Sequence, residues 1–158
     1  MSTERAKLFQ ETLQNSIAWI HELSERSAIA DDQQVYHLLC ATLQALRDRL
    51  TIDEAVQLGA QLPVLIRGLY YDGWRPTHTP MRIRHRDEFI AQVAARYHAR
   101  PLPDLEAGVR AEIAVLNHNI SIDEALSVIR TLPDALRELW PAHIVKTARL
   151  EEHRPLAG

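Results

Sequence analysis

Two acidic pairs are the groups in this sequence most suggestive of chemistry. They occupy positions 53–54 and recur seventy residues later at 123–124. Such carboxylate pairs could bind metal ions or act as an acid and a base. However, each pair begins two residues after a hydroxyl residue that stands at the start of an apolar periodic segment. That pattern is typical of a capping box, in which the hydroxyl accepts a first-turn N–H and the glutamate reaches back. We therefore predict structural caps at Thr51, Glu54, Ser121 and Glu124.

Eight histidines could ligate a metal if the fold brought them together. They lie at positions 21, 37, 78, 85, 98, 118, 143 and 153. No His-Glu-x-x-His motif occurs, and no glutamate stands three residues before a histidine, so the sequence has none of the usual metal-binding helix patterns. We expect no metal ligand and no cofactor.

Nucleophilic catalysis has equally little support. Cys40 is the only cysteine, and it lies beside the apolar stripe of a predicted helix, where a small buried thiol is usual. No Gly-x-Ser-x-Gly, Walker or Gly-x-Gly-x-x-Gly motif is present. We predict no catalytic or cofactor-binding residue, and the sequence favours a protein that is not an enzyme. The single cysteine and the lack of a secretory pattern predict a cytoplasmic location.

The one local excess of charge lies at residues 71–86, which carry four basic and one acidic side chains. Residues 1–70 carry six basic and nine acidic side chains, and residues 87–158 carry eight and eleven. The four arginines could pair with these acidic flanks, or they could contact an anionic partner, because guanidinium groups bind carboxylate and phosphate. The net charge of −3 argues against a general nucleic-acid binder. The candidate contacts are Arg75, Arg82, Arg84 and Arg86.

Apolar spacing predicts that helices position these groups. The first stripe has apolar residues three and four apart: Ala6, Phe9, Leu13, Ile17, Ile20 and Leu23. A second stripe covers 35–50, and further helices should begin near Thr51 and Pro63. We expect each helix to bury its stripe. Neither strand alternation nor an apolar run of about 20 residues occurs, so we expect neither a sheet nor a membrane span.

The chain matches itself at an offset of 70 residues. Twelve of the 52 positions in 19–70 are identical to their counterparts in 89–140, which indicates a structural repeat. We predict an all-α fold, a tandem repeat of two four-helix bundle-like units with about eight to nine helices. The expected divisions are 1–72, a basic proline-containing linker at 73–86, and 87–158, which ends in a short helix.

Several of these segments together resemble a known family. They are the repeated Leu-Pro motif with its following arginine, the Tyr-Tyr-Asp-Gly-Trp-Arg-Pro turn and the Arg-His-Arg-Asp-Glu-Phe-Ile segment. Across residues 17–141, the chain resembles the bacterial DUF2267 family of unknown function. The resemblance implies an all-helical tandem bundle in a small bacterial cytosolic protein, with a loose association with stress responses. It implies no activity, cofactor or catalytic residue.

We therefore expect a non-catalytic helical interaction module, stress-associated as the resemblance implies, that binds a partner protein or a second copy of itself through a groove between the repeats. Nucleic acid and membrane are not expected partners. Two alternatives stay open. One is polyanion or nucleic-acid contact through the basic linker, and the other is an enzyme or small-ligand carrier with a pocket between the repeats.

Overall fold

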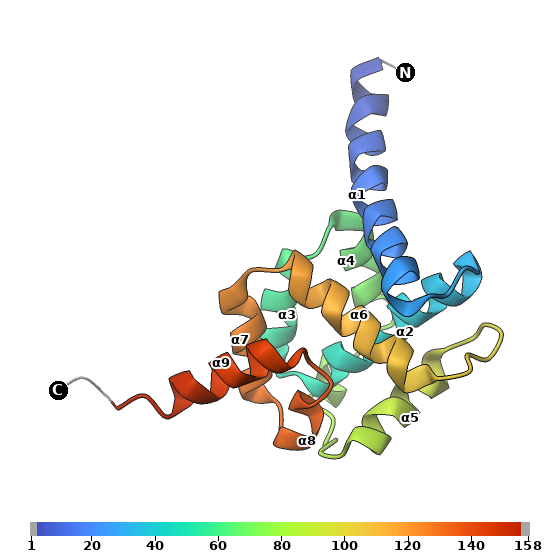
Figure 1. Cartoon of the computed structure of the whole chain (residues 1–158). Coiled ribbons are helices and arrows are strands. Elements are labelled where there is room, and N and C mark those ends of the chain that lie inside the picture. The colour runs from blue at the N-terminus through green and yellow to red at the C-terminus, as the bar shows by residue number, and fades with distance from the viewer. Residues whose placement is uncertain (1–2, 156–158) are drawn as a thin grey trace.

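The computed structural model describes residues 3–155, and this part of the chain is entirely helical, with no strand (Figure 1). The prediction of an all-α fold with eight to nine helices is confirmed. A short 3-10 helix, η1 (Pro76–His78), lies in the linker. The α-helices are α1 (Thr3–Ser27), α2 (Asp32–Arg49), α3 (Ile52–Gln61), α4 (Val64–Tyr71), α5 (Arg86–Arg96), α6 (Leu105–Asn119), α7 (Ile122–Thr131), α8 (Asp134–Arg137) and α9 (Ala142–Glu152).

Among residues 3–155, side-chain caps fix the starts of four helices. At each one, an oxygen of the residue before the helix accepts the backbone N–H three positions on. This contact satisfies a first-turn donor that has no partner inside the helix. The helices consequently begin one residue after the polar signal. The capping residues are Asp31 for α2, Thr51 for α3, Asp104 for α6 and Ser121 for α7.

The two halves of the chain contribute to one hydrophobic core. Helix α2 packs against α6, and α3 packs against α7. Helix α1 also packs on α6 of the second half, while α5 packs on α2 of the first. This exchange is what a pseudo-two-fold axis would produce. We therefore propose that the predicted units 1–72 and 87–158 are interlocked copies and not separate lobes.

The linker follows the surface of α2. The Met81 N–H donates to the Asp48 carbonyl at 2.7 Å, and Arg49 Nε donates to the Ile83 carbonyl at 2.6 Å. Ile83 is buried in the shared core. Trp74 packs against the same core and stacks on the ring at the end of α4, with the ring centroids 5.5 Å apart. The linker is thus fixed to the helical body by both backbone and side-chain contacts.

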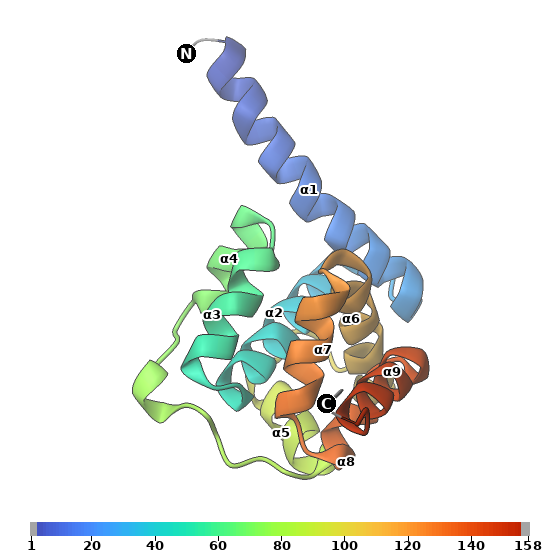
Figure 2. The same ribbon diagram turned by 90° about the vertical axis from the view of Figure 1, so that its left-hand side faces the viewer.

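Helix α1 departs from the expectation that each helix buries its stripe, which is wrong for its N-terminal half. That half rises clear of the other helices in both views (Figures 1 and 2). A helix of 25 residues is about 37 Å long, and it meets the body from about Thr12 onward. Trp19 and Leu23 are buried there. The exposed apolar side chains are Leu8 (61%), Phe9 (74%), Leu13 (50%) and Ile17 (52%).

Candidate functional site

The exposed apolar face of α1 is a continuous stripe. At 100° per residue, Ala6, Phe9, Leu13, Ile17 and Ile20 fall within one narrow sector of the helix. The stripe leads into a groove of about 480 Å³ between α1 and α2, because two of its residues also line that groove. The groove is lined by Ile17, Ile20, His21, Ser24, Asp32, Gln33 and Tyr36. An apolar surface therefore runs from the projecting end of α1 to the body.

The two ends of this surface differ in charge. Residues 3–10 carry two basic side chains and one acidic side chain, whereas residues 21–32 carry one basic and four acidic side chains. The projecting end of α1 is therefore positive, and the end beside the groove is negative. If the partner is a second copy of the chain, opposite potentials at the two ends favour an antiparallel arrangement of the two α1 helices.

Two of the four linker arginines lie together on the outer side of the linker. Arg82 and Arg84 are exposed on either side of the buried Ile83, as alternation in an extended segment requires. Arg49 lies nearby, and its pKa is lowered by burial and then by the charge of Arg84. Neither Arg82 nor Arg84 forms an ion pair within residues 3–155. These two side chains form a small basic surface.

The other two linker arginines have different surroundings. Arg86 Nε lies 3.0 Å from a carboxylate oxygen of Glu106, and its Nη1 lies 3.7 Å from one of Glu138. Arg86 therefore pairs with the acidic second half of the chain. Arg75 is exposed and lines a polar hollow on another part of the linker. The four predicted contact residues thus do not form a single patch.

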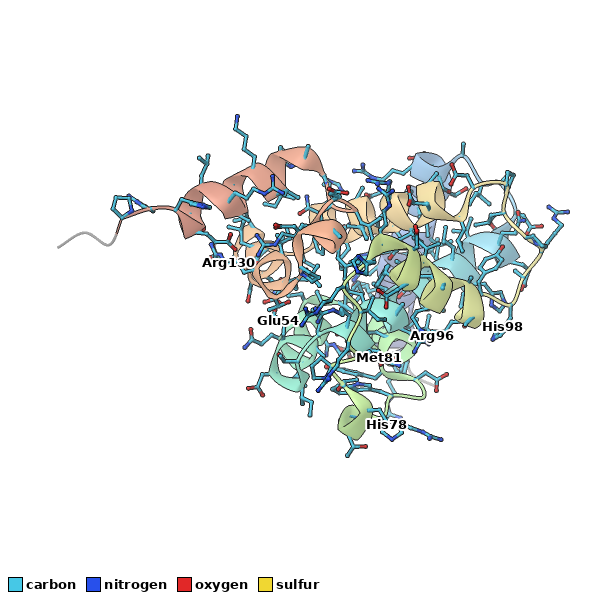
Figure 3. All side chains as sticks on the ribbon, turned by 90° about the horizontal axis from the view of Figure 1, so that it is seen from below. Glu54, His78, Met81, Arg96, His98 and Arg130 are labelled. Atoms are coloured by element: carbon cyan, nitrogen blue, oxygen red, sulfur yellow. The ribbon has the colours of Figure 1, made fainter. Side chains whose placement is uncertain are left out.

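The polar hollow lies between the linker, α2 and α5 and has a volume of about 480 Å³. Figure 3 labels Arg96, Met81 and His78 along it. An ion cluster forms its inner wall. Arg47 Nε donates to Asp48 Oδ1 at 2.9 Å, and Arg96 Nη2 donates to Asp48 Oδ2. The hollow is lined by Gln44, Arg47, Asp48, Asp72, Gly73, Arg75, His78, Thr79, Met81 and Arg96.

The hydroxyl groups predicted as caps lie where the capping box requires. Thr51 Oγ1 accepts the Glu54 N–H at 3.2 Å, and Ser121 Oγ accepts the Glu124 N–H at 3.2 Å. The glutamate side chains, however, do not complete the predicted capping boxes. The Ser121 N–H donates to Gln61 Oε1 at 3.1 Å, and the two glutamate side chains turn toward each other. The expectation that these carboxylates reach back to their own caps therefore needs correction.

Glu54 and Glu124 form a buried pair where α3 meets α7 (Glu54 is labelled in Figure 3). The Glu54 carboxyl group lies close enough to that of Glu124 to shift its pKa. Ser127 Oγ donates to Glu54 Oε2 at 2.8 Å. Burial, the hydrogen bond to Glu54 and the negative charge of Glu54 together raise the pKa of Glu124 to about 8. The pair lies between two helices, and neither glutamate lines the hollows described here.

Two further titratable groups have a raised pKa, Glu112 on α6 and the half-buried Cys40 on α2. Glu112 is completely buried, neither carboxylate oxygen has a hydrogen-bond partner, and burial raises its pKa well above the usual range. Burial also raises the pKa of the Cys40 thiol to about 11, so Cys40 is not a thiolate at neutral pH. Within residues 3–155, no three or more histidine, cysteine or acidic side chains gather as metal ligands.

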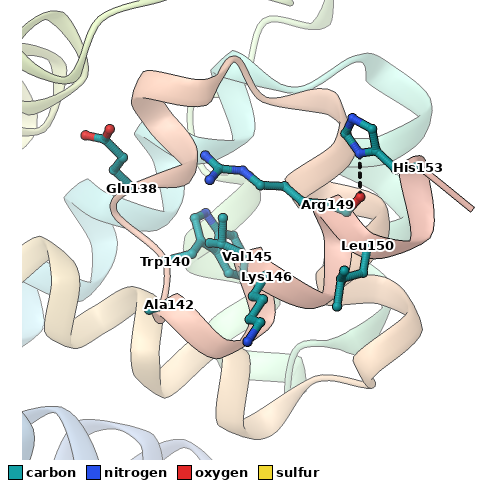
Figure 4. A pocket seen from close by; sticks show the side chains of 8 residues that line it. All are labelled: Glu138, Trp140, Ala142, Val145, Lys146, Arg149, Leu150 and His153. Atoms are coloured by element: carbon teal, nitrogen blue, oxygen red, sulfur yellow. Dashed lines mark hydrogen bonds between the residues drawn. The ribbon is translucent and has the colours of Figure 1, made fainter.

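A third hollow, of about 510 Å³, runs along α9 (Figure 4). Trp140 is buried and contributes to its floor, while Leu150 is mostly exposed. Lys146 and Arg149 also line it. This hollow therefore combines an apolar floor with two cationic side chains and the carboxylate of Glu138.

The fold and its surfaces define a helical protein with a projecting arm, and no helix among residues 3–155 is long and apolar enough to cross a membrane. Residues 17–139 match the family described as "Uncharacterized conserved protein (DUF2267)". The chain belongs to this family. A comparison with curated proteins found no match. The matched region leaves out the first half of α1, which carries Phe9 and Leu13.

Several residues of the candidate surfaces were missed in the sequence. Arg47, Asp48 and Arg96 line the polar hollow. Each lies within a helix whose sequence has the usual amphipathic pattern, so no motif marks it as part of a site. One available signal was Arg47-Asp48, two adjacent charged residues near the C-terminal end of a strongly apolar stripe. Glu112 gave a similar signal, because it stands between the apolar Ala111 and Ile113.

Proposed function

We propose that this protein is a non-catalytic helical interaction module that pairs with a second copy of itself through α1. The observation that carries the proposal is the exposed apolar stripe on the projecting half of the helix. Phe9 is 74% exposed and Leu13 is 50% exposed, which leaves a large apolar area in water. Contiguous exposed apolar surface marks an interaction site more often than isolated apolar residues do.

The spacing of the stripe supports a second copy as the occupant. Phe9 and Ile17 each lie four residues from Leu13, and Ala6 and Ile20 each lie seven residues from it. An antiparallel α1 centred on Leu13 therefore places Phe9 of one chain against Ile17 of the other. It also places the small Ala6 against the larger Ile20. The stripe is complementary to itself in this one orientation.

The groove and the charges support the same orientation. In an antiparallel pair, the positive end of α1 from one chain reaches the negative end beside the groove of the other. There Ile20 and Tyr36 offer further apolar surface. This location differs from the expected groove between the repeats, because both lining helices belong to residues 1–72.

Sedimentation velocity over a dilution series tests the proposal. The wild-type chain should shift from monomer to dimer as its concentration rises, whereas Phe9→Glu and Leu13→Glu should stay monomeric. Ile122→Glu is the matched control, because Ile122 is 61% exposed, between the values for Leu13 and Phe9, but lies on α7. A wild-type chain that stays monomeric throughout, or a control that dissociates as readily as the stripe variants, would contradict the proposal.

A cytoplasmic, bacterial setting is part of the same proposal. The unpaired Cys40 supports a reducing compartment.

A further inference from the structure

We propose that the polar hollow between the linker, α2 and α5 binds a small organic molecule through an oxyanion group, either a carboxylate or a phosphate. Arg75, Arg96 and His78 are the contacts. The inference is independent of self-association, because these residues lie on the linker and α5 and not on α1.

The inner wall of the hollow is held in place. Asp48 accepts from Arg47 through one carboxylate oxygen and from Arg96 through the other. Arg47 Nη1 donates to the Tyr70 carbonyl at 2.7 Å and to the Asp72 carbonyl at 2.9 Å. These contacts tie α2, the end of α4 and α5 together. The guanidinium groups therefore need little rearrangement to receive a ligand, which favours binding.

The outer wall is also shaped before a ligand arrives. The His78 N–H donates to the Arg75 carbonyl at 2.9 Å, which closes the turn of η1. Thr79 donates its N–H and its hydroxyl to the Pro76 carbonyl, at 3.1 and 2.8 Å. The Met81 N–H then holds the chain to α2. The linker thus presents Arg75 and His78 from a defined turn.

Positively charged side chains outnumber negatively charged ones in the lining of the hollow. Both oxygens of Asp48 already accept from the arginines Arg47 and Arg96. The Arg75 guanidinium forms no ion pair within the described residues. A guanidinium has five N–H donors and no acceptor, and it pairs best with carboxylate or phosphate oxygens. The Asp72 carboxylate is the one remaining anionic group in the lining. The lining therefore has three arginines but only two carboxylates, those of Asp48 and Asp72.

The volume indicates the size of the ligand. About 480 Å³ falls within the range of roughly 300–1,000 Å³ that is usual for small-molecule pockets. A bare inorganic ion would leave most of this space to water. The mostly polar lining disfavours a lipid tail. A small polar metabolite that carries an anionic group is the ligand class that fits.

Calorimetric titrations with inorganic phosphate, a small phosphate ester and succinate test the inference and separate the two oxyanion sources. Binding of the phosphates alone identifies a phosphate ligand, and binding of succinate alone identifies a carboxylate ligand. Either result supports the inference. Arg75→Gln should weaken the binding roughly tenfold or more, because it removes a charged donor. No binding by any of the three probes would overturn it.

Two controls keep this test specific. Arg82→Gln/Arg84→Gln removes positive charge from the outer side of the linker and should leave the affinity unchanged. His78→Gln alters the hollow at an exposed position and should weaken binding. If the double variant weakens binding as much as Arg75→Gln does, the probes sense general charge and the assigned hollow is wrong. Phe9→Glu should bind normally, which separates this inference from the dimer proposal.

Discussion

Raising the pH should weaken the folded state through the buried pair of glutamates. The pKa of Glu124 is raised from 4.5 to about 8 in the folded chain. Between these values the folded chain holds a proton that the unfolded chain has released, so the free energy of unfolding falls as the pH rises. The contribution is fully present below pH 4.5 and is lost as the pH passes about 8.

The size of this effect follows from the same two values. At 1.36 kcal/mol per pH unit, the full contribution is roughly 5 kcal/mol, of which roughly 3 kcal/mol falls between pH 5.5 and 8. Glu124→Gln should remove it, because a glutamine amide can donate to Glu54 at every pH. The difference in stability between wild type and variant should therefore shift in favour of the variant as the pH rises.

Urea denaturation at several pH values from 5.5 to 8.5 measures the difference in the free energy of unfolding between wild type and Glu124→Gln. Asp123→Asn is the matched control, because Asp123 is adjacent in sequence but exposed. Glu112 has a raised pKa as well, so a residual slope of the same sign should remain in Glu124→Gln. Parallel stability curves for wild type and Glu124→Gln across this range would refute the reasoning.

Further predictions concern caps and glycines. Thr51→Ala and Ser121→Ala should each lower the free energy of unfolding by about 1 kcal/mol, because each leaves a first-turn N–H without its acceptor; unchanged denaturation midpoints would exclude this role. Gly59→Ala should destabilise the chain, because the new Cβ would lie 2.2 Å from the Tyr71 hydroxyl. Gly68→Ala is its matched partner and should stabilise α4 by roughly 0.5–1 kcal/mol, since nothing lies within 4 Å. Equal effects of the two glycine substitutions would contradict the packing seen around α3.

The helices could be predicted because their signals are local. The hydroxyl of Thr51 and the apolar period of α2 depend only on residues within a few turns. The partners of the capping glutamates depend on how α3 meets α7, which no local pattern records. The same holds for Asp48, which meets Arg96 across 48 positions of sequence.

The exposed stripe of α1 shows a different limit. Phe9 and Leu13 have the same spacing as a stripe that packs on the body, and periodicity cannot distinguish an intramolecular surface from an intermolecular one. What decides it is the length of α1 relative to the helices beneath it. That length becomes visible only in three dimensions.

Cysteine cross-linking tests the central claim, antiparallel pairing of α1, most directly. In a Cys40→Ser background, Leu13→Cys should form a disulfide-linked dimer with itself under mild oxidation, because Leu13 would lie on the two-fold axis. Phe9→Cys alone should not, but Phe9→Cys mixed with Ile17→Cys should form a mixed dimer. Efficient cross-linking of Phe9→Cys to itself would indicate a parallel pair, and no cross-linking at Leu13→Cys would contradict pairing through α1.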